Sequence, residues 1–392
     1  MQEPETFLYG APFSEGGRAR RAGGVPCRKK QFAGSFFRGG DIKRLFGVLF
    51  LMMLMISTTA CGREPYTKTA VIMDTVVELQ ADDGEQEQAV DEGLAYLKKL
   101  DALASQKDGS DLTALHMAAG TGEWVQVSPE IYDMLAFSKD WSEKTNGAFD
   151  ITTGPLIKLW GIGTESERVP SDAEIAEARS HVGWKKLELR AEDHSARLTE
   201  AGMRVHLGAV AKGYAIDGLR KIYEKHGVKN GLVSLGGSSI YALGENPKGK
   251  KWRIGIRHPR ADDPKTYLGV APLSDAALSS SGDYERYFEQ DGQRYHHIFN
   301  PATGRPAATG LEGVTVVARG EHAGELSDIL TTALFVLGEE KGKALIESCG
   351  EDVTALFVRQ DGETFCLGTA KSGELPNLKG ILEDVDDSVA WE

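Results

Sequence analysis

The segment LSDILTTALFVLG, residues 326–338, holds the two side chains whose spacing points most directly to chemistry, Asp328 and Thr332. On a helix, residues four apart share one face, so this carboxylate and this hydroxyl could offer two oxygens to one hard cation. Mg²⁺ takes few protein oxygens and leaves positions for phosphate and water, which suits a diphosphate ligand. A structural role is also open, in which the Asp caps a helix and the Thr hydrogen-bonds to its own backbone.

The segment HLGAVAKGYAID, residues 206–217, places small residues and Lys212 where a strand pattern gives way to a helix pattern. Such a junction exposes backbone N–H groups and a positive helix end, and both suit a phosphate. The segment lacks the complete spacing of the P-loop and of the dinucleotide-binding fingerprint. Close helix packing is the more common reason for such glycines and alanines, so this segment alone decides nothing.

Three further segments are rich in glycine and turn residues. LVSLGGSSIYALG (232–244) carries a Gly-Gly step inside a strand pattern, which indicates a bulge or a close approach of the backbone to a ligand. SSSGDYER (279–286) and HHIFNPATGRP (296–306) are polar, and the second contains good turn residues whatever its function.

The elements that must position these residues follow from hydrophobic periodicity and helix signals. Pro129 after a capping Ser128 opens one helix, and Ser171 with Glu174 forms a capping box that opens another. We predict helices over 85–104, 129–145, 171–181, 209–226, 321–336 and 339–348. We predict strands over 69–80, 186–190, 203–207, 231–242, 252–257, 267–274, 293–299, 313–318, 353–359 and 363–367. This irregular order favours an α+β fold over a doubly wound sheet.

Composition and charge exclude several classes of protein. Hydrophobic residues make up 41% and charged residues 26% of the 392 residues, as in globular proteins. The first 60 residues carry nine basic and four acidic side chains, whereas the rest carry 36 and 54. So acidic a body argues against nucleic-acid binding by phosphate neutralisation. The four cysteines are too few and too scattered for a disulfide framework or a zinc ribbon.

The N-terminal region reads as an export signal. Lys43 and Arg44 precede an apolar run over 45–60, which is too short to span a bilayer comfortably. Its end, TTACG, resembles a bacterial lipoprotein signal in which Cys61 receives the lipid, although Thr58 stands where Leu is usual. An ordinary signal peptide, or an uncleaved anchor with an incidental cysteine, is the alternative.

We therefore expect an exported protein that a lipid on Cys61 anchors to the extracytoplasmic side of the cell membrane. The chain divides into a basic leader (1–44), a signal segment (45–61), a body (66–370) and an acidic tail (376–392).

Taken together and in order, eight segments of the body resemble the ApbE-type FAD:protein FMN transferases. They are the segments quoted above together with MDT (73–75), GAFDITTGPL (147–156) and WRIGIRHP (252–259). The resemblance covers roughly residues 66–370. It implies an α+β body with mixed or antiparallel sheets, flanking helices and a flavin site. It also implies Mg²⁺-dependent transfer of FMN from FAD to a Thr or Ser hydroxyl of an acceptor flavoprotein of an electron-transport system.

The resemblance carries site residues over by position. It implies that the metal takes oxygens from Asp328, Thr332 and the backbone carbonyl of Ala209, in agreement with the helical spacing noted above. His297 matches a histidine proposed to assist proton transfer. The positions that match FAD contacts are Met73, Phe149, Asp150, His206, Lys212 and Phe299.

Two positions depart from the family pattern. Many relatives carry Asp where this chain has His206, and a stretch that usually closes in Asn closes here in His116. Both lie in segments that the resemblance places against FAD, so we expect the changes to affect FAD binding and not the metal ligands.

The mechanism that we infer is metal-assisted phosphoryl transfer. An acceptor hydroxyl attacks the FMN phosphorus, AMP leaves, and His297, with an ordinary pKa near 6.5, takes the proton. Two alternatives remain: a hydrolase that converts FAD to FMN and AMP at the same site, and a lipid-anchored flavin- or solute-binding protein without catalysis. The presence of Asp328, Thr332 and His297 argues against the second.

Overall fold

The framework of the protein is a long antiparallel sheet. The structure is a computed structural model that describes residues 64–261, 263 and 266–369; the predicted leader, signal segment and acidic tail lie outside these residues. In the described part of the chain the sheet has eight strands, each antiparallel to its neighbours. In spatial order they are β1 (Tyr66–Ile72), β2 (Thr75–Ala81), β6 (Gly231–Leu235), β7 (Ser239–Leu243), β10 (Ala276–Gly282), β15 (Leu311–Arg319), β16 (Asp352–Arg359) and β17 (Thr364–Gly368).

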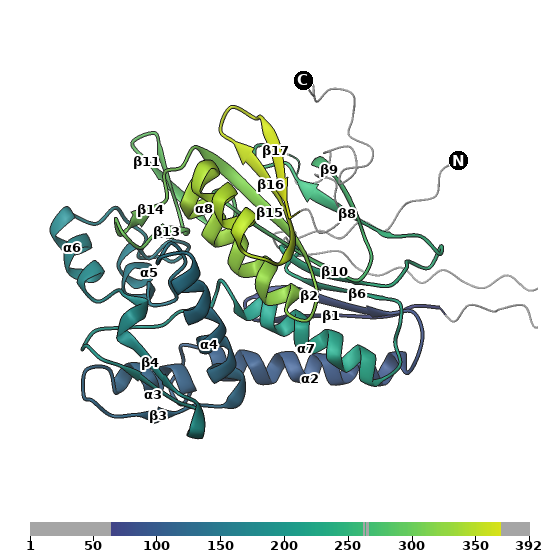
Figure 1. The fold of residues 1–392 in the computed structure, drawn as a ribbon, viewed down its shortest axis with the longest axis horizontal. Coiled ribbons are helices and arrows are strands. Elements are labelled where there is room, and N and C mark those ends of the chain that lie inside the picture. The colour runs from purple at the N-terminus through teal and green to yellow at the C-terminus, as the bar shows by residue number, and fades with distance from the viewer. Residues whose placement is uncertain (1–63, 262, 264–265, 370–392) are drawn as a thin grey trace, which may run out of the picture. The chain divides into compact units, whose positions relative to one another are not determined.

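Both faces of this sheet are covered. Helices α2 (Gln86–Ala104), α7 (Ala211–Lys225) and α8 (Ala323–Ser348) pack on one face, and α2 and α7 run side by side (Figure 1). The hairpin of β8 (Trp252–Arg257) and β9 (Tyr267–Leu273) covers part of the other face. In β6, for example, Val233 belongs to the helix-side core and Leu232 to the core under β8 and β9. Burial on both faces explains why such strands are apolar throughout.

Smaller elements connect to this framework. One group comprises α3 (Asp111–Met117), α4 (Pro129–Lys144), the 3₁₀ turns Trp184–Lys186 and Ala191–Asp193, and a small sheet of β3 (Val125–Gln126), β5 (Ser195–Leu198) and β4 (Leu187–Arg190). A third core, formed around Trp160, joins α5 (Gly154–Trp160) and α6 (Asp172–Ser180) to the hairpins β11 (Tyr287–Gln290)–β12 (Gln293–His296) and β13 (Phe299–Asn300)–β14 (Arg305–Pro306). Figure 1 shows the helices α3 to α6 grouped beside the main sheet.

The α+β prediction is confirmed, and most predicted helices lie within two residues of their observed bounds. The capping box of Ser171 and Glu174 is present. Ser128 occupies the N-cap position of α4 with an extended backbone, as predicted, but its side chain makes no cap hydrogen bond. The two helices predicted at 321–336 and 339–348 form one helix, α8, with a break in helical geometry at Gly338.

Four predicted strands are wrong, and one of them, at 293–299, is divided between β12 and β13. Residues 69–80 and 231–242 each form a hairpin, because Met73 and Asp74 turn the first and Gly236 and Gly237 the second, all with positive φ. Residues 203–207 form no strand and make only an isolated bridge between Arg204 and Thr153. Alternation of apolar and polar residues can continue through a short turn, of two residues in the first hairpin and three in the second, so periodicity alone does not reveal the turn.

A search of the described residues for membrane-spanning helices found none with sufficient length and apolarity.

Candidate functional site

The N-terminal ends of α7 and α8 are in direct contact. A Cβ atom on Gly213 would lie 2.3 Å from the backbone oxygen of Gly324, and a Cβ on Gly324 would lie equally close to the oxygen of Gly213. Each helix also caps the other. Asp328 Oδ2 accepts the Gly213 N–H at 3.0 Å, and Asp217 accepts the N–H groups of Gly324 and Glu325 at 2.9 Å each. These aspartates satisfy donors that a helix start leaves unpaired, so the junction holds both helices in register.

Asp328 therefore has one oxygen in a structural role and one that remains open to a ligand. The residue is only 4% exposed. Its Oδ1 lies 3.7 Å from Lys212 Nζ, an ion-pair distance that is too long for a hydrogen bond. A carboxylate oxygen that makes no hydrogen bond within the described part of the chain, beside a cation and a helix N-terminus, fits a site that binds phosphate and a metal ion together.

The backbone carbonyl of Ala209 is similarly open. In a regular helix, the N–H of Gly213 would bond the carbonyl four residues earlier, which is that of Ala209. Here that N–H donates to Asp328 instead. Among the described residues no other backbone donor outside regular elements reaches the Ala209 carbonyl. The sequence resemblance implied this oxygen as a ligand, and the backbone geometry leaves it available.

The two threonines that follow Asp328 behave differently. The Thr331 hydroxyl donates to the Asp328 carbonyl at 2.7 Å and contacts Ser281 Oγ at 2.8 Å. The Thr332 hydroxyl, four residues from Asp328 on the same helix, forms no hydrogen bond within the described part of the chain. Of the structural roles considered for this pair, Asp328 does cap a helix through Oδ2, but the bond back to the backbone is made by Thr331. Within the described residues, Thr332 therefore supplies a third oxygen without a partner. These three oxygens fit a hard cation such as Mg²⁺.

His297 is positioned by the backbone of the loop before β11. Its N–H and its Nδ1 both lie within hydrogen-bond distance of the Arg286 carbonyl, at 3.1 and 3.2 Å. Because a carbonyl only accepts, Nδ1 carries the proton and Nε2 is left as the acceptor. The expectation of an ordinary pKa is wrong: burial, together with the charges of Arg286 and Lys212, lowers the pKa of His297 to about 3. Its imidazole is therefore neutral throughout the physiological range.

The neighbouring His296 has a structural role. It is buried, its Nε2 donates to the Ala307 carbonyl at 3.0 Å, and its Nδ1 accepts the Ile298 N–H at 3.3 Å. Both ring nitrogens of His296 therefore already form hydrogen bonds with the backbone that follows β12. His297 is the histidine of this pair that can accept a proton.

His206 shapes the turn that precedes Ala209. Its backbone N–H donates to the Ile151 carbonyl at 2.8 Å, and its Nδ1 accepts the Gly208 N–H at 3.2 Å. Burial, with a smaller effect of the Arg286 charge, lowers the pKa of His206. Arg286 thus influences both His206 and His297, and Lys212 influences His297, so these basic groups surround one region.

Met73 occupies a strained position next to the Gly-Gly turn. Met73 and Asp74 have φ values of 57° and 55°, a left-handed conformation that is uncommon for residues other than Gly, Asn and Asp. The Gly236 N–H donates to the Val76 carbonyl at 2.8 Å, and a Cβ on Gly236 would lie 2.2 Å from Thr75 Oγ1. The two turns therefore lie side by side. The Gly-Gly step forms the turn of the β6–β7 hairpin against β2 and not a bulge inside a strand, and its approach to a ligand stays a prediction.

Three other predicted FAD contacts have packing roles. Phe149 and Phe299 are buried, and the Phe299 ring lies 6.0 Å from that of Trp160. Asp150 is buried and accepts hydrogen bonds from Thr152, at 2.8 and 2.7 Å, and from the Trp184 N–H at 2.9 Å. Burial raises the pKa of Asp150. Their contact with FAD stays a prediction.

Two residues in the quoted segments gained a role only from the structure. Asp217, in the helix pattern, caps α8, and Arg286, in SSSGDYER, holds His297. His116 accepts the Val205 N–H at 2.9 Å, and burial lowers its pKa to about 4, so this neutral ring supports the segment that carries His206. No sequence signal for these long-range contacts exists beyond the residue types themselves.

The chain is similar to known proteins in both sequence and structure. The model of the ApbE family matches residues 73–357. An FAD:protein FMN transferase of Treponema pallidum is 34% identical over 335 residues, which are 79% of this chain and 90% of that protein. An FAD:protein FMN transferase of Klebsiella pneumoniae is 36% identical over 261 residues, which are 67% of this chain and 78% of that protein.

Solved structures are similar as well. The ApbE protein of Thermotoga maritima has a TM-score of 0.69 at 30% identity and covers 79% of this chain and 98% of its own. The flavin transferase ApbE of Vibrio cholerae has a TM-score of 0.69 at 27% identity and covers 80% and 99%.

Proposed function

The chain belongs to the ApbE family, and from that premise we propose that it uses Mg²⁺ to move the FMN moiety of FAD onto a Thr or Ser hydroxyl of an acceptor flavoprotein, with release of AMP. The curated relatives are FAD:protein FMN transferases, and this chain is a transferase of the same kind. The acceptor that we propose is an exported flavoprotein of an electron-transport system.

The observation that carries the Mg²⁺ part of the proposal is that three oxygens, two on α8 and one just before α7, have no hydrogen-bond donor among the described residues. Asp328 Oδ1, the Thr332 hydroxyl and the Ala209 carbonyl would hold the ion. When bound, Mg²⁺ supplies positive charge that offsets the charge developing on the diphosphate oxygens.

The chain's own residues supply the remaining chemistry. Lys212 and the N-terminal end of α7 bind the diphosphate region of FAD. The acceptor hydroxyl oxygen attacks the FMN phosphorus while the bond from that phosphorus to the AMP phosphate breaks, so AMP leaves with the bonding electron pair. The hydroxyl proton passes to Nε2 of His297, the nitrogen that its hydrogen bond to Arg286 leaves unprotonated.

The membrane part of the proposal rests on the sequence of residues 45–61. A lipid on Cys61 would place the enzyme on the extracytoplasmic side of the cell membrane, beside exported acceptor proteins.

The proposal is tested by incubating the purified protein with FAD, Mg²⁺ and an exported candidate acceptor domain. We expect a flavin-fluorescent acceptor band on a denaturing gel, one AMP released per label, and loss of both with EDTA. An acceptor in which the target Thr is replaced by Ala is the control. AMP release without a label on any of several acceptors would indicate an FAD hydrolase, and bound FAD without either product would indicate a binding protein.

The profile of kcat/KM against pH is expected to show no fall on the acid side near pH 6.5 that arises from protonation of His297. A group that loses its proton near pH 3 is already neutral at pH 5, so raising the pH further does not increase the fraction of competent base. The measurement is kcat/KM between about pH 5 and 8 for the wild type and for His297→Gln. A limb with an apparent pKa near 6.5 that is absent from His297→Gln would contradict this assignment.

Replacing Met73 with Gly is expected to separate activity from stability. Glycine relieves a left-handed strain of about 1 kcal/mol and frees the unfolded chain by a similar amount. The net loss therefore comes from the packing of the half-buried Met73 side chain against the core, and it is expected to stay within about 2 kcal/mol of unfolding free energy. Loss of the flavin contact is expected to lower kcat/KM about tenfold. Asp74→Gly, in the same turn with nearly the same φ, is the control, and it should leave kcat/KM within about twofold. Equal losses in the two variants would place the effect in the turn backbone.

A further inference from the structure

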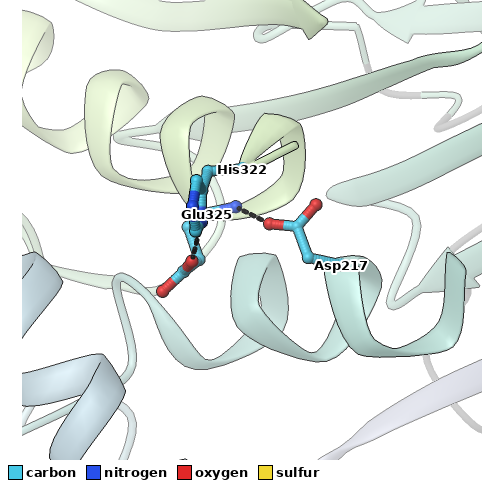
Figure 2. Close-up of side chains that lie close together, drawn as sticks. All are labelled: Asp217, His322 and Glu325. Carbon is cyan, nitrogen blue, oxygen red and sulfur yellow. Dashed lines mark hydrogen bonds and ion pairs between the residues drawn. The ribbon is translucent and has the colours of Figure 1, made fainter. Parts of the chain in front are cut away.

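A second group of metal-binding side chains lies one helical turn from Asp328. Asp217 of α7, with His322 and Glu325 at the start of α8, bring three possible ligand atoms within 4.8 Å of one another. Figure 2 shows the three side chains at the junction of these helices. Glu325 precedes Asp328 by three residues, and Asp217 follows Gly213 by four, so the group is displaced along both helices from the oxygens assigned to Mg²⁺.

Glu325 has an oxygen that the fold leaves without a partner. The residue is 4% exposed, and its Oε2 pairs with His322 Nδ1 at 3.0 Å. Within the described residues, its Oε1 is buried without a hydrogen bond. Burying a carboxylate oxygen without a partner lowers the stability of the folded protein, and by more than burying a neutral polar group without one. A cation at this position would supply the missing interaction.

The other two members of the group are already oriented. Asp217 is held by the two backbone N–H groups at the start of α8, as described above. The His322 ring stacks on Phe137, with their centroids 5.2 Å apart. Support of this kind fixes ligand orientation in known metal sites.

The group also lines a cavity of suitable charge. The cavity has a volume of about 870 Å³ and lies between α2, α4, α7 and α8. Its charged lining comprises five carboxylates, Glu130 among them, and two lysines, so the lining is acidic. Because His322 is half exposed, an ion would have a path from solvent.

We propose that Asp217, His322 and Glu325 bind one divalent transition-metal cation, with Zn²⁺ as the best-fitting probe. One imidazole and two carboxylates form a mixed nitrogen and oxygen donor set, which suits Zn²⁺ and its neighbours in the first transition row better than Mg²⁺. Such an ion joins α7 to α8 beside the junction that positions Asp328, so its binding stabilises the folded protein.

The test is a Zn²⁺ titration of the chelator-treated, full-length protein by calorimetry, in excess Mg²⁺ and without FAD. We expect one Zn²⁺ per chain, a higher Tm with Zn²⁺, and visible absorption bands when Co²⁺ replaces it. His322→Ala and Glu325→Gln are each expected to weaken Zn²⁺ binding at least ~10-fold. Glu130→Gln makes the same chemical change in the same cavity, where Glu130 pairs with Lys99, and should stay within about twofold.

The outcomes separate this site from the flavin chemistry. Because the titration contains no FAD or acceptor, it gives the same answer whether or not the protein transfers FMN. The proposal would be overturned if the wild type bound neither Zn²⁺ nor Co²⁺. It would also be overturned if His322→Ala and Glu325→Gln bound Zn²⁺ as tightly as the wild type does. His322 is the more exposed of the two positions, so His322→Ala tests the site even if the Glu325 variant proves unstable.

Discussion

Replacing Asp328 with Asn is expected to lower the rate of FMN transfer by about 10³-fold, or roughly 4 kcal/mol in the activation free energy, while the protein stays folded. The amide keeps an oxygen that can accept the Gly213 N–H, so the cap on α7 survives. What is lost is the negative charge and the open oxygen that we assign to Mg²⁺. The measurement is the rate of acceptor labelling, with circular dichroism and thermal unfolding as the check on folding.

Asp328→Ala removes both roles at once. It is expected to lose activity to the same extent and also about 1–2 kcal/mol of unfolding free energy, because the cap is gone. Full transfer activity of either variant in the presence of Mg²⁺ would eliminate the metal assignment.

The threonines that follow provide a matched pair of controls. Thr332→Val removes the hydroxyl that we assign to the metal and should slow transfer with little loss of stability. Thr331→Val removes two hydrogen bonds and should lower the free energy of unfolding by about 1–3 kcal/mol. It should slow transfer less than Thr332→Val does. The opposite pattern would mean that the site had been assigned to the wrong hydroxyl.

Gly213→Ala is expected to be the most destabilising small substitution at the site. Its Cβ would lie 2.3 Å from the Gly324 backbone oxygen, and a backbone atom cannot move aside as a flexible side chain can. The helices must separate, which we expect to lower the free energy of unfolding by at least about 3 kcal/mol, the upper end of the usual loss when a side chain is inserted into a well-packed core. Separation also breaks the caps at Asp328 and Asp217, so transfer activity is lost even where some protein remains folded.

The control is the same change at Gly342, which lies in α8. A Cβ there would lie 3.2 Å from the Leu334 side chain, which can adjust, and alanine is the better helix former by about 1 kcal/mol. We expect Gly342→Ala to change the free energy of unfolding by less than ~1 kcal/mol. The measurement is chemical denaturation of the two variants side by side. A Gly213→Ala protein as stable and as active as the wild type would show that the close contact of the helices is not needed.

Features that depend on neighbours along the chain can be predicted from the amino-acid sequence. Helix periodicity and helix-start signals predicted α2, α4, α6 and α7, and they predicted α8 as two helices, because both kinds of signal relate residues three and four apart. The same local rule pairs Asp328 with Thr332 on one helix face. The capping box of Ser171 and Glu174 is equally local, since its members are three residues apart.

The resemblance of ordered segments indicated the family, and the family comparisons confirmed it. A resemblance assigns roles by position, however, and does not describe the surroundings of a side chain. It therefore supported an ordinary pKa for His297, which burial beside Arg286 and Lys212 lowers to about 3.

Features that depend on residues far apart in the chain follow from the tertiary fold. Met73 and Asp74 form a turn because β1 and β2 pair with each other and β2 pairs with β6, although methionine is not a typical turn residue. Asp217 and Asp328 cap each other's helices across more than a hundred residues, and the same contact frees the Ala209 carbonyl and gathers the Glu325 group. Such contacts depend on how elements pack, and packing selects partners by shape and burial across the whole fold, which local spacing does not record.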